Sequence, residues 1–408
     1  MSAASAPRAV PWLSNGAALA LVLAVALAVR LALILMMGEG DHFGDTPQYD
    51  AAARNILAGG GPGKDFPRPP VYPGLMALGY LIGGAGNFLA VRIFQLAFGV
   101  GVVALTFVLG RAVGGAGLGL LAAGLAAFSP TLTFTTGMIY PEVVYTFLLL
   151  LMTLLWRALG SGGAGRATAD GLATGIGWLT SQVVVVPAAA LAAWFVLQRS
   201  RRWGLLAVAG LAALFVVTPW LLYQKAAYGR AGFHLQKADY VMNIARADTA
   251  LYGARSIPST VTLTDSAQLM SGEPAGSATS LLRRELGWFM ARPGGYLWDY
   301  TREFLHFFQP LPDRVTSRNR FNQPVVKWIG AIHFTPLLLF AIVGVLFGRA
   351  SRADRALLAI VPLATAALYA FFFTQARYRI PVEPHMTVLA AMGLMAAWSR
   401  IRAPSKRS

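Results

Sequence analysis

The chain has 408 residues, of which 56% are hydrophobic and only 12% are charged. Ordinary soluble domains carry roughly 25% charged residues, so this composition argues against a water-soluble enzyme and indicates a membrane protein. Lys and Arg number 34 against 17 Asp and Glu, a net charge of +17, and cysteine is absent. The sequence therefore excludes disulfides, thiolate metal sites and a cysteine nucleophile.

The first predicted membrane span is Ala17–Met37, an apolar run of 21 residues with a single charge, Arg30. A spanning helix needs about 20 such residues. A cleaved signal peptide with Arg8 in its charged N-terminal region is the alternative, but no small-residue cleavage motif follows the run. We expect a retained helix, from which Arg30 extends its guanidinium toward the outer surface.

The next segment, Gly38–Pro73, is too polar to span a membrane, and its first half predicts a helix. Asp45 or Thr46 is the expected N-cap, and Pro47 suits the first turn. The apolar positions of this helix recur at helical spacing and are Tyr49, Ala52, Ala53, Ile56 and Leu57. Asp45 thus lies at the entry of the helix, either as a simple cap or as a functional carboxylate.

A glycine-rich hinge, Gly59–Gly63, leads to Lys64 and the proline-rich stretch Pro67–Pro73. The glycine spacing does not fit a P-loop, which argues against nucleotide binding. Because the prolines favour extended backbone and oppose a helix, we expect Arg68 to project from a stiff segment at the membrane surface. A guanidinium there can bind a phosphate through paired donors or be an ordinary surface arginine.

Nine further apolar stretches bring the predicted spans to ten. The two between Gly171 and Gln198 are short, and a single helix kinked at Pro187 is the alternative. The nine stretches are Asn87–Gly110, Ala116–Gly137, Val143–Leu159, Gly171–Val184, Val186–Gln198, Trp203–Tyr223, Val326–Phe347, Ala356–Phe373 and Pro384–Trp398.

A second polar segment, Gln224–Gln323, separates two groups of spans, and Leu281–Phe308 within it has amphipathic helical spacing. We therefore divide the chain into an N-terminal membrane module (1–223) that contains the first polar loop (38–73), a large loop (224–325) and C-terminal membrane helices (326–408).

Alternating the spans from an inner N-terminus places fourteen basic residues and two carboxylates in the inner loops, a balance of +12. This agrees with the positive-inside rule. Both polar segments then lie outside, and the basic balance reflects orientation, with no need for a nucleic-acid partner.

Two more polar motifs lie at outer ends of spans. Glu142, in Tyr140-Pro141-Glu142, is a carboxylate at a membrane edge, where such groups usually serve a site; capping the fourth span is the alternative. Arg377 and Arg379 break the positive-inside pattern in a short outer loop. They suit either a specific phosphate or lipid head groups in general.

Several motifs, taken in their order along the chain, resemble those of a known family. They are Gly44-Asp45-Thr46, Tyr49-Asp50, Asn55-Ile56-Leu57, Arg68-Pro69-Pro70-Val71-Tyr72-Pro73, Tyr140-Pro141-Glu142 and Arg377-Tyr378-Arg379. The set resembles the bacterial GT-C glycosyltransferases, and within them the family-39-like group of protein mannosyltransferases, lipid A aminoarabinose transferases and rhizobial galacturonosyltransferases. The resemblance implies an all-α polytopic bundle of about ten membrane helices in the bacterial inner membrane, with a periplasmic active site.

The resemblance also implies an activity: inverting transfer of a sugar from a polyprenyl-phosphate donor to a lipid, glycan or protein acceptor. Asp45 would be the catalytic base and Glu142 a second acid, with Asp50 and Asp41 as alternative acids. The expected phosphate ligands are Arg68, Arg377 and Arg379, and the weaker substrate contacts are Tyr49, Lys64, Tyr72, Tyr140 and Tyr378.

No cofactor is predicted, because the five histidines show no zinc spacing. A divalent ion at Asp45 and Glu142 is the alternative, since some GT-C enzymes use one. A lipid-linked-sugar flippase and a polysaccharide polymerase are the competing functions. A transporter predicts ionisable groups along a path through the membrane, whereas the ionisable groups here gather on one side.

Overall fold

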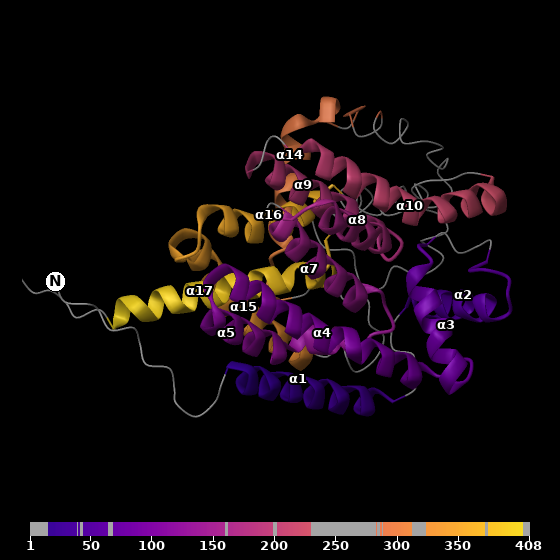
Figure 1. Cartoon of the computed structure of the whole chain (residues 1–408), viewed down its shortest axis with the longest axis horizontal. Coiled ribbons are helices and arrows are strands. Elements are labelled where there is room, and N and C mark those ends of the chain that lie inside the picture. The colour runs from indigo at the N-terminus through magenta and orange to yellow at the C-terminus, as the bar shows by residue number, and fades with distance from the viewer. Residues whose placement is uncertain are drawn as a thin grey trace, which may run out of the picture.

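The computed structural model of the chain describes residues 15–38, 40, 44–63, 68–159, 162–198, 202–229, 283, 286–287, 289–311, 324–371 and 374–402. Every regular element within these ranges is a helix (Figure 1). The predicted all-α architecture is therefore confirmed.

Apolar helices of the N-terminal half pack around a core of small and aliphatic side chains. In Figure 1, α2 and α3 lie together at the end of the bundle where α1 and α10 end and α4 begins. The helices of this half are α1 (Asn15–Met37), α2 (Thr46–Leu57), α3 (Val71–Gly83), α4 (Phe88–Gly114), α5 (Ala116–Ala127), α6 (Pro130–Gly137), α7 (Glu142–Leu159), α8 (Ala164–Trp178), the 3-10 turn η1 (Gln182–Val184), α9 (Val185–Gln198) and α10 (Trp203–Tyr228).

The C-terminal half returns to the same bundle, where α17 packs against α5, α15 and α16. In the large polar segment, α14 falls inside the predicted amphipathic stretch, and residues 230–282 lie outside the described ranges. The elements are α14 (Pro293–His306), α15 (Pro324–Phe347), α16 (Arg352–Tyr369), the 3-10 segment η3 (Ala376–Val382) and α17 (Glu383–Ile401).

A described helix overlaps each of the ten predicted spans. Within the described residues, six helices are long and apolar enough to cross a membrane, or seven if the bent pair α5–α6 forms one span. The six are α1, α4, α7, α10, α15 and η3 joined to α17. The positions of the apolar elements are thus confirmed, whereas the number of ten membrane crossings stays a prediction.

The span α5–α6 is broken by 57°, and Arg30 stabilises the break. Its guanidinium is fully buried and donates to the carbonyl oxygens of Ala126 and Ala127, both at 3.2 Å. These are carbonyls of the last turn of α5, which have no partner within their own helix. The expectation that Arg30 extends to the membrane surface is therefore wrong, because the broken helix offers it buried acceptors.

The helix α3 corrects a second expectation. The proline-rich stretch was expected to be extended throughout, but α3 begins at Val71, and Pro73 lies in its first turn, where a proline is tolerated. The N–H of Val71 donates to the carbonyl of Leu179, 3.0 Å away. The first loop is thereby fixed to the end of α8, and residues 68–70, which the structure describes just before α3, are not helical.

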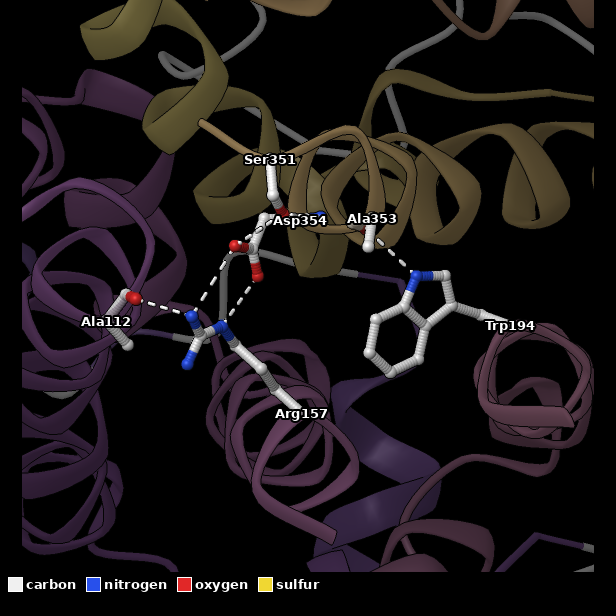
Figure 2. A network of polar contacts seen from close by, with 6 residues as sticks. All are labelled: Ala112, Arg157, Trp194, Ser351, Ala353 and Asp354. Carbon is white, nitrogen blue, oxygen red and sulfur yellow. Dashed lines mark hydrogen bonds and ion pairs between the residues drawn. The ribbon is translucent and has the colours of Figure 1, made fainter. Parts of the chain in front are cut away.

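A polar network joins helix ends at the inner side predicted from the charge pattern (Figure 2). Arg157, at the end of α7, donates from Nε to Asp354 Oδ1 over 2.7 Å and from Nη2 to the carbonyl of Ala112 over 2.5 Å. Asp354 also accepts from Ser351, the N-cap of α16. The network therefore ties α4, α7 and α16 together.

We expect Asp354→Ala to lower the free energy of unfolding by about 1–3 kcal/mol, because it leaves a half-buried guanidinium without its carboxylate. Arg352→Ala, in the same turn but exposed, is the matched control and is expected to change little. Denaturant titration of the purified protein in detergent measures both. Equal midpoints for Asp354→Ala and the unsubstituted protein would contradict the structural role of this network.

Candidate active site

Asp45 stands at the start of α2. It occupies the N-cap position, but its side chain makes no capping hydrogen bond. Its carboxylate instead pairs with two guanidinium groups: Oδ1 lies 3.1 Å from Nη2 of Arg68, and Oδ2 lies 3.6 Å from Nη1 of Arg377. Because 28% of the Asp45 side chain is exposed, a ligand can reach it. The fold thus brings together charged groups from both ends of the chain.

Arg68 is held by one face of α2, on which Asp45, Gln48 and Tyr49 recur at helical spacing. Its Nη2 also donates to Gln48 Oε1 over 2.8 Å, and its guanidinium lies 4.8 Å from the ring centre of Tyr49. Burial lowers the pKa of Arg68, but Tyr49 and Asp45 raise it by more, so that the net shift is upward. The guanidinium therefore stays charged at neutral pH.

Arg377 reaches the same carboxylate from η3. Its guanidinium lies 5.1 Å from the ring centre of Tyr140 and 5.3 Å from that of Tyr378. Nε and Nη1 form no hydrogen bond with any residue that the structure describes. The contact of Nη1 with Asp45, at 3.6 Å, is an ion pair and is too long for a hydrogen bond. Arg377 consequently has hydrogen-bond donors to offer to an anionic ligand.

Tyr140 positions the backbone of Asp45. Its hydroxyl oxygen accepts a hydrogen bond from the Asp45 N–H over 3.0 Å. Burial raises the pKa of Tyr140, so the hydroxyl is neutral at physiological pH. Tyr140, which is 2% exposed, therefore connects the segment after α6 to the first residue of the candidate site.

We expect Tyr140→Phe to lower the catalytic efficiency of the activity proposed below by about fivefold, since one neutral hydrogen bond contributes about 1 kcal/mol. Tyr80→Phe is the matched control, because the Tyr80 hydroxyl donates to Asp50 at the surface of α2 and does not contact Asp45. Steady-state kcat/KM of the two variants checks this. A loss of similar size in both would show that Tyr140 has no special role at Asp45.

Aromatic rings form the wall behind the charges. Tyr49 packs edge-on against Tyr72 and Tyr140, with ring centres 5.1 and 6.0 Å apart, and Tyr378 stacks on Tyr369 at 4.2 Å. Tyr49 and Tyr72 are 6% and 0% exposed. The wall keeps the site apolar and orients the two arginines, and its predicted contacts with substrate stay predictions.

Glu142 is the first residue of α7, one position before the predicted start of this span at Val143. Burial raises the pKa of Tyr49, and the charge of Glu142 adds to that rise. The same charge adds to the rise at Tyr140. Glu142 therefore lies near the tyrosines beside Asp45, and its role as a second acid stays a prediction.

Arg379 lies apart from these charges. Its Nη1 donates to the carbonyl of Gln309 over 2.6 Å, and its guanidinium lies 3.5 Å from the ring centre of Phe334. The structure therefore does not place it beside Asp45 with Arg377, because η3 directs the two side chains to different neighbours. Lys64 lies outside the described residues.

The described residues contain no group of three or more His, Asp or Glu that could hold a metal ion. If a divalent ion binds at this site, Asp45 and Glu142 are the predicted carboxylate ligands. Independence from metal stays a prediction.

Two polar residues of α4 that support the site through buried hydrogen bonds were not predicted from the sequence. Gln95 accepts from the Tyr72 hydroxyl over 2.6 Å and donates to the carbonyls of Thr136 and Met138 over 2.8 and 2.6 Å. Arg92 donates to the carbonyls of residues 38, 40 and 137. Both are fully buried. Their signal was present in the sequence, as polar residues three positions apart in an apolar span.

Comparison with known proteins supports the resemblance noted in the sequence. Residues 67–223 match the sequence model of the dolichyl-phosphate-mannose-protein mannosyltransferase family. A comparison with curated proteins gave no match. The matched range contains Arg68, Tyr140 and Glu142, whereas Asp45 and Arg377 lie outside it.

Solved structures show the same fold. ArnT from Cupriavidus metallidurans bound to undecaprenyl phosphate aligns with a TM-score of 0.59 and 16% identity, over 95% of this chain and 62% of that one. AglB, an oligosaccharyltransferase from Archaeoglobus fulgidus, in complex with an inhibitory peptide and a dolichol-phosphate, aligns with a TM-score of 0.52 and 14% identity, over 94% of this chain and 50% of that one. The chain thus spans less than two thirds of either protein, and the expected GT-C fold is confirmed.

Proposed function

We propose that this chain, with its GT-C fold, transfers a sugar from a polyprenyl-phosphate donor to a lipid, glycan or protein acceptor. The observation that carries the proposal is the convergence of Arg68 and Arg377 on the partly exposed carboxylate of Asp45. Such a transfer needs a base for the acceptor hydroxyl and cations for the departing phosphate. Here the carboxylate of Asp45 directly contacts both guanidinium groups.

The reaction proposed is a direct displacement. The acceptor oxygen forms a bond with the anomeric carbon of the sugar while the bond from that carbon to the phosphate oxygen breaks. The proton of the hydroxyl passes to the Asp45 carboxylate, and the electron pair of the broken bond stays on the phosphate. One displacement inverts the anomeric centre and requires no covalent sugar–enzyme intermediate.

The two arginines have their largest effect on the leaving group. A polyprenyl-phosphate sugar is a phosphodiester with one negative charge, and the released polyprenyl phosphate carries up to two. Guanidinium groups that donate to the phosphate oxygens stabilise this added charge where it develops. We propose that the phosphate accepts hydrogen bonds from Arg68 and Arg377 in place of their ion pairs with Asp45, which leaves Asp45 free to accept a proton.

The bound ligands of the structural relatives support a lipid phosphate as the donor carrier, since ArnT was solved with undecaprenyl phosphate and AglB with a dolichol-phosphate. The positive-inside pattern supports a site on the outer side, and we propose that Asp45 and Arg377 face the periplasm at the bacterial inner membrane. A flippase or a polymerase would share the lipid-linked substrate. A flippase breaks no glycosidic bond and needs no base, and the order of motifs in the first polar loop argues against a polymerase.

The proposal is tested by incubating the purified full chain in detergent with a panel of polyprenyl-phosphate sugars and crude lipid, glycan and peptide acceptors. Release of free polyprenyl phosphate that depends on both donor and acceptor is the expected result. Movement of the lipid-linked sugar across a vesicle membrane without any release would instead support the flippase.

A further inference from the structure

The helix α14, from the large polar segment, contacts Thr374, which lies two residues before η3, the element that carries Arg377. Glu303 of α14 is 7% exposed, and its Oε2 accepts two hydrogen bonds from Thr374, one from the N–H over 2.8 Å and one from Oγ1 over 2.9 Å. His306, one turn later, lies with Nδ1 2.5 Å from the same Thr374 Oγ1. Thr374 is fully buried and precedes Arg377 by three positions.

The far side of Arg377 is fixed by the same part of the chain. The carbonyl of Gln309, three residues after the end of α14, accepts from Arg379 over 2.6 Å. The segment that bears Arg377 is therefore anchored on both sides, at Thr374 and at Arg379. Both anchors come from α14 or the residues that follow it.

Aromatic packing adds a third connection. Phe307 stacks on Tyr369 with ring centres 6.3 Å apart, and Tyr369 stacks on Tyr378 at 4.2 Å with planes only 5° apart. The Tyr378 ring in turn lies 5.3 Å from the guanidinium of Arg377. A shift of α14 would consequently move the ring against which Arg377 rests.

Loss of the Glu303 carboxylate would remove the acceptor of both hydrogen bonds that Thr374 donates to it. A buried N–H that loses its acceptor is costly, so Thr374 would move to find another partner. The second oxygen of Glu303, Oε1, lies 3.8 Å from Nη2 of Arg302, which also contacts Asp299 at 3.8 Å. One carboxylate oxygen therefore faces this ion pair, while the other holds Thr374.

We infer that Glu303 is a positioning residue: through Thr374 it directs Arg377 toward the phosphate of the lipid substrate. The inference rests on the proposed function, because it assigns Arg377 to that phosphate. The inference also connects α14 with the reaction site. Through Thr374, α14 fixes the position of Arg377, which pairs with Asp45 of the first polar loop. Glu303 itself does not touch the substrate.

The test compares Glu303→Ala with Glu303→Gln, whose amide oxygen can still accept from Thr374. Asp299→Asn is the control on the same helix. Two quantities are measured on the full chain in detergent: hydrogen–deuterium exchange of a peptide that covers residues 374–379, and the Kd for polyprenyl phosphate. We expect Glu303→Ala to exchange faster and to bind about tenfold more weakly, with Glu303→Gln and Asp299→Asn close to the unsubstituted protein.

The combined variant Glu303→Ala/Arg377→Ala separates the route of the effect. If Glu303 acts through Arg377, its loss adds little once Arg377 is gone. Unchanged exchange in Glu303→Ala, or a full additional loss of affinity in the combined variant, overturns the inference. If Arg377→Ala alone binds polyprenyl phosphate normally, the phosphate assignment of the proposed function fails, while the exchange measurement still reports whether Glu303 orders η3.

Discussion

Asp45→Asn is expected to lower the rate of sugar transfer by about 10²–10⁴-fold, the usual contribution of a general base. Asparagine keeps the size of the side chain and a hydrogen-bonding oxygen but cannot accept the proton of the acceptor hydroxyl. Binding of polyprenyl phosphate is expected to stay the same or to become tighter. The reason is that the carboxylate of Asp45 occupies Arg68 and Arg377 in the absence of substrate and repels an incoming phosphate.

This pairing of a large loss in rate with undiminished affinity is specific to a base. Asp50→Asn is the control, because Asp50 lies on the same helix but is paired with Arg54 and Tyr80, and it should retain full activity. Single-turnover release of polyprenyl phosphate and equilibrium binding of the same lipid measure the two quantities. Equal transfer rates for Asp45→Asn and the unsubstituted protein would remove Asp45 as the base.

Arg377→Ala is expected to weaken binding of polyprenyl phosphate by about 2–4 kcal/mol, or roughly 30- to 1,000-fold, as is typical when one partner of a buried charge pair is truncated. Arg377 is expected to matter more than a surface arginine for a structural reason. Its Nε and Nη1 form no hydrogen bond with the described residues, so the phosphate supplies acceptors that the protein does not.

Arg54→Ala is the control for charge alone, since Arg54 is an exposed arginine paired with Asp50. Arg377→Lys distinguishes charge from geometry, because lysine keeps the charge but lacks the planar pair of donors. We expect it to recover part of the affinity. Isothermal titration or a filter-binding assay with radiolabelled polyprenyl phosphate gives the values, and an unaltered Kd for Arg377→Ala would refute its assignment to the phosphate.

Local patterns predicted the helices well, because the length of an apolar run and the residues that start a helix can both be recognised within a short stretch of sequence. The start of α2 next to Asp45 was predicted in this way, and the start of α7 was predicted to within one residue. The helix α3 was missed because its prolines argue against a helix unless they fall in the first turn, and the register of Pro73 was not visible from the composition.

Contacts between segments far apart in the sequence determine the side-chain partners that local patterns could not predict. Arg30 donates to buried carbonyls at the end of α5, where the α5–α6 span is broken. Arg379 contacts Gln309 and Phe334, and its binding to phosphate stays a prediction. In the same way, Asp45 is a cap by position, but Arg68 and Arg377 turn its carboxylate away from the helix end. Such choices depend on which segments meet in three dimensions, and no spacing rule reports them.

The most direct measurement is an experimental structure of the full chain with bound polyprenyl phosphate. We expect phosphate oxygens within hydrogen-bonding distance of the guanidinium groups of Arg68 and Arg377, with the carboxylate of Asp45 released from at least one of them and open to an acceptor hydroxyl. A phosphate bound elsewhere, with both ion pairs of Asp45 intact, would contradict the proposed function.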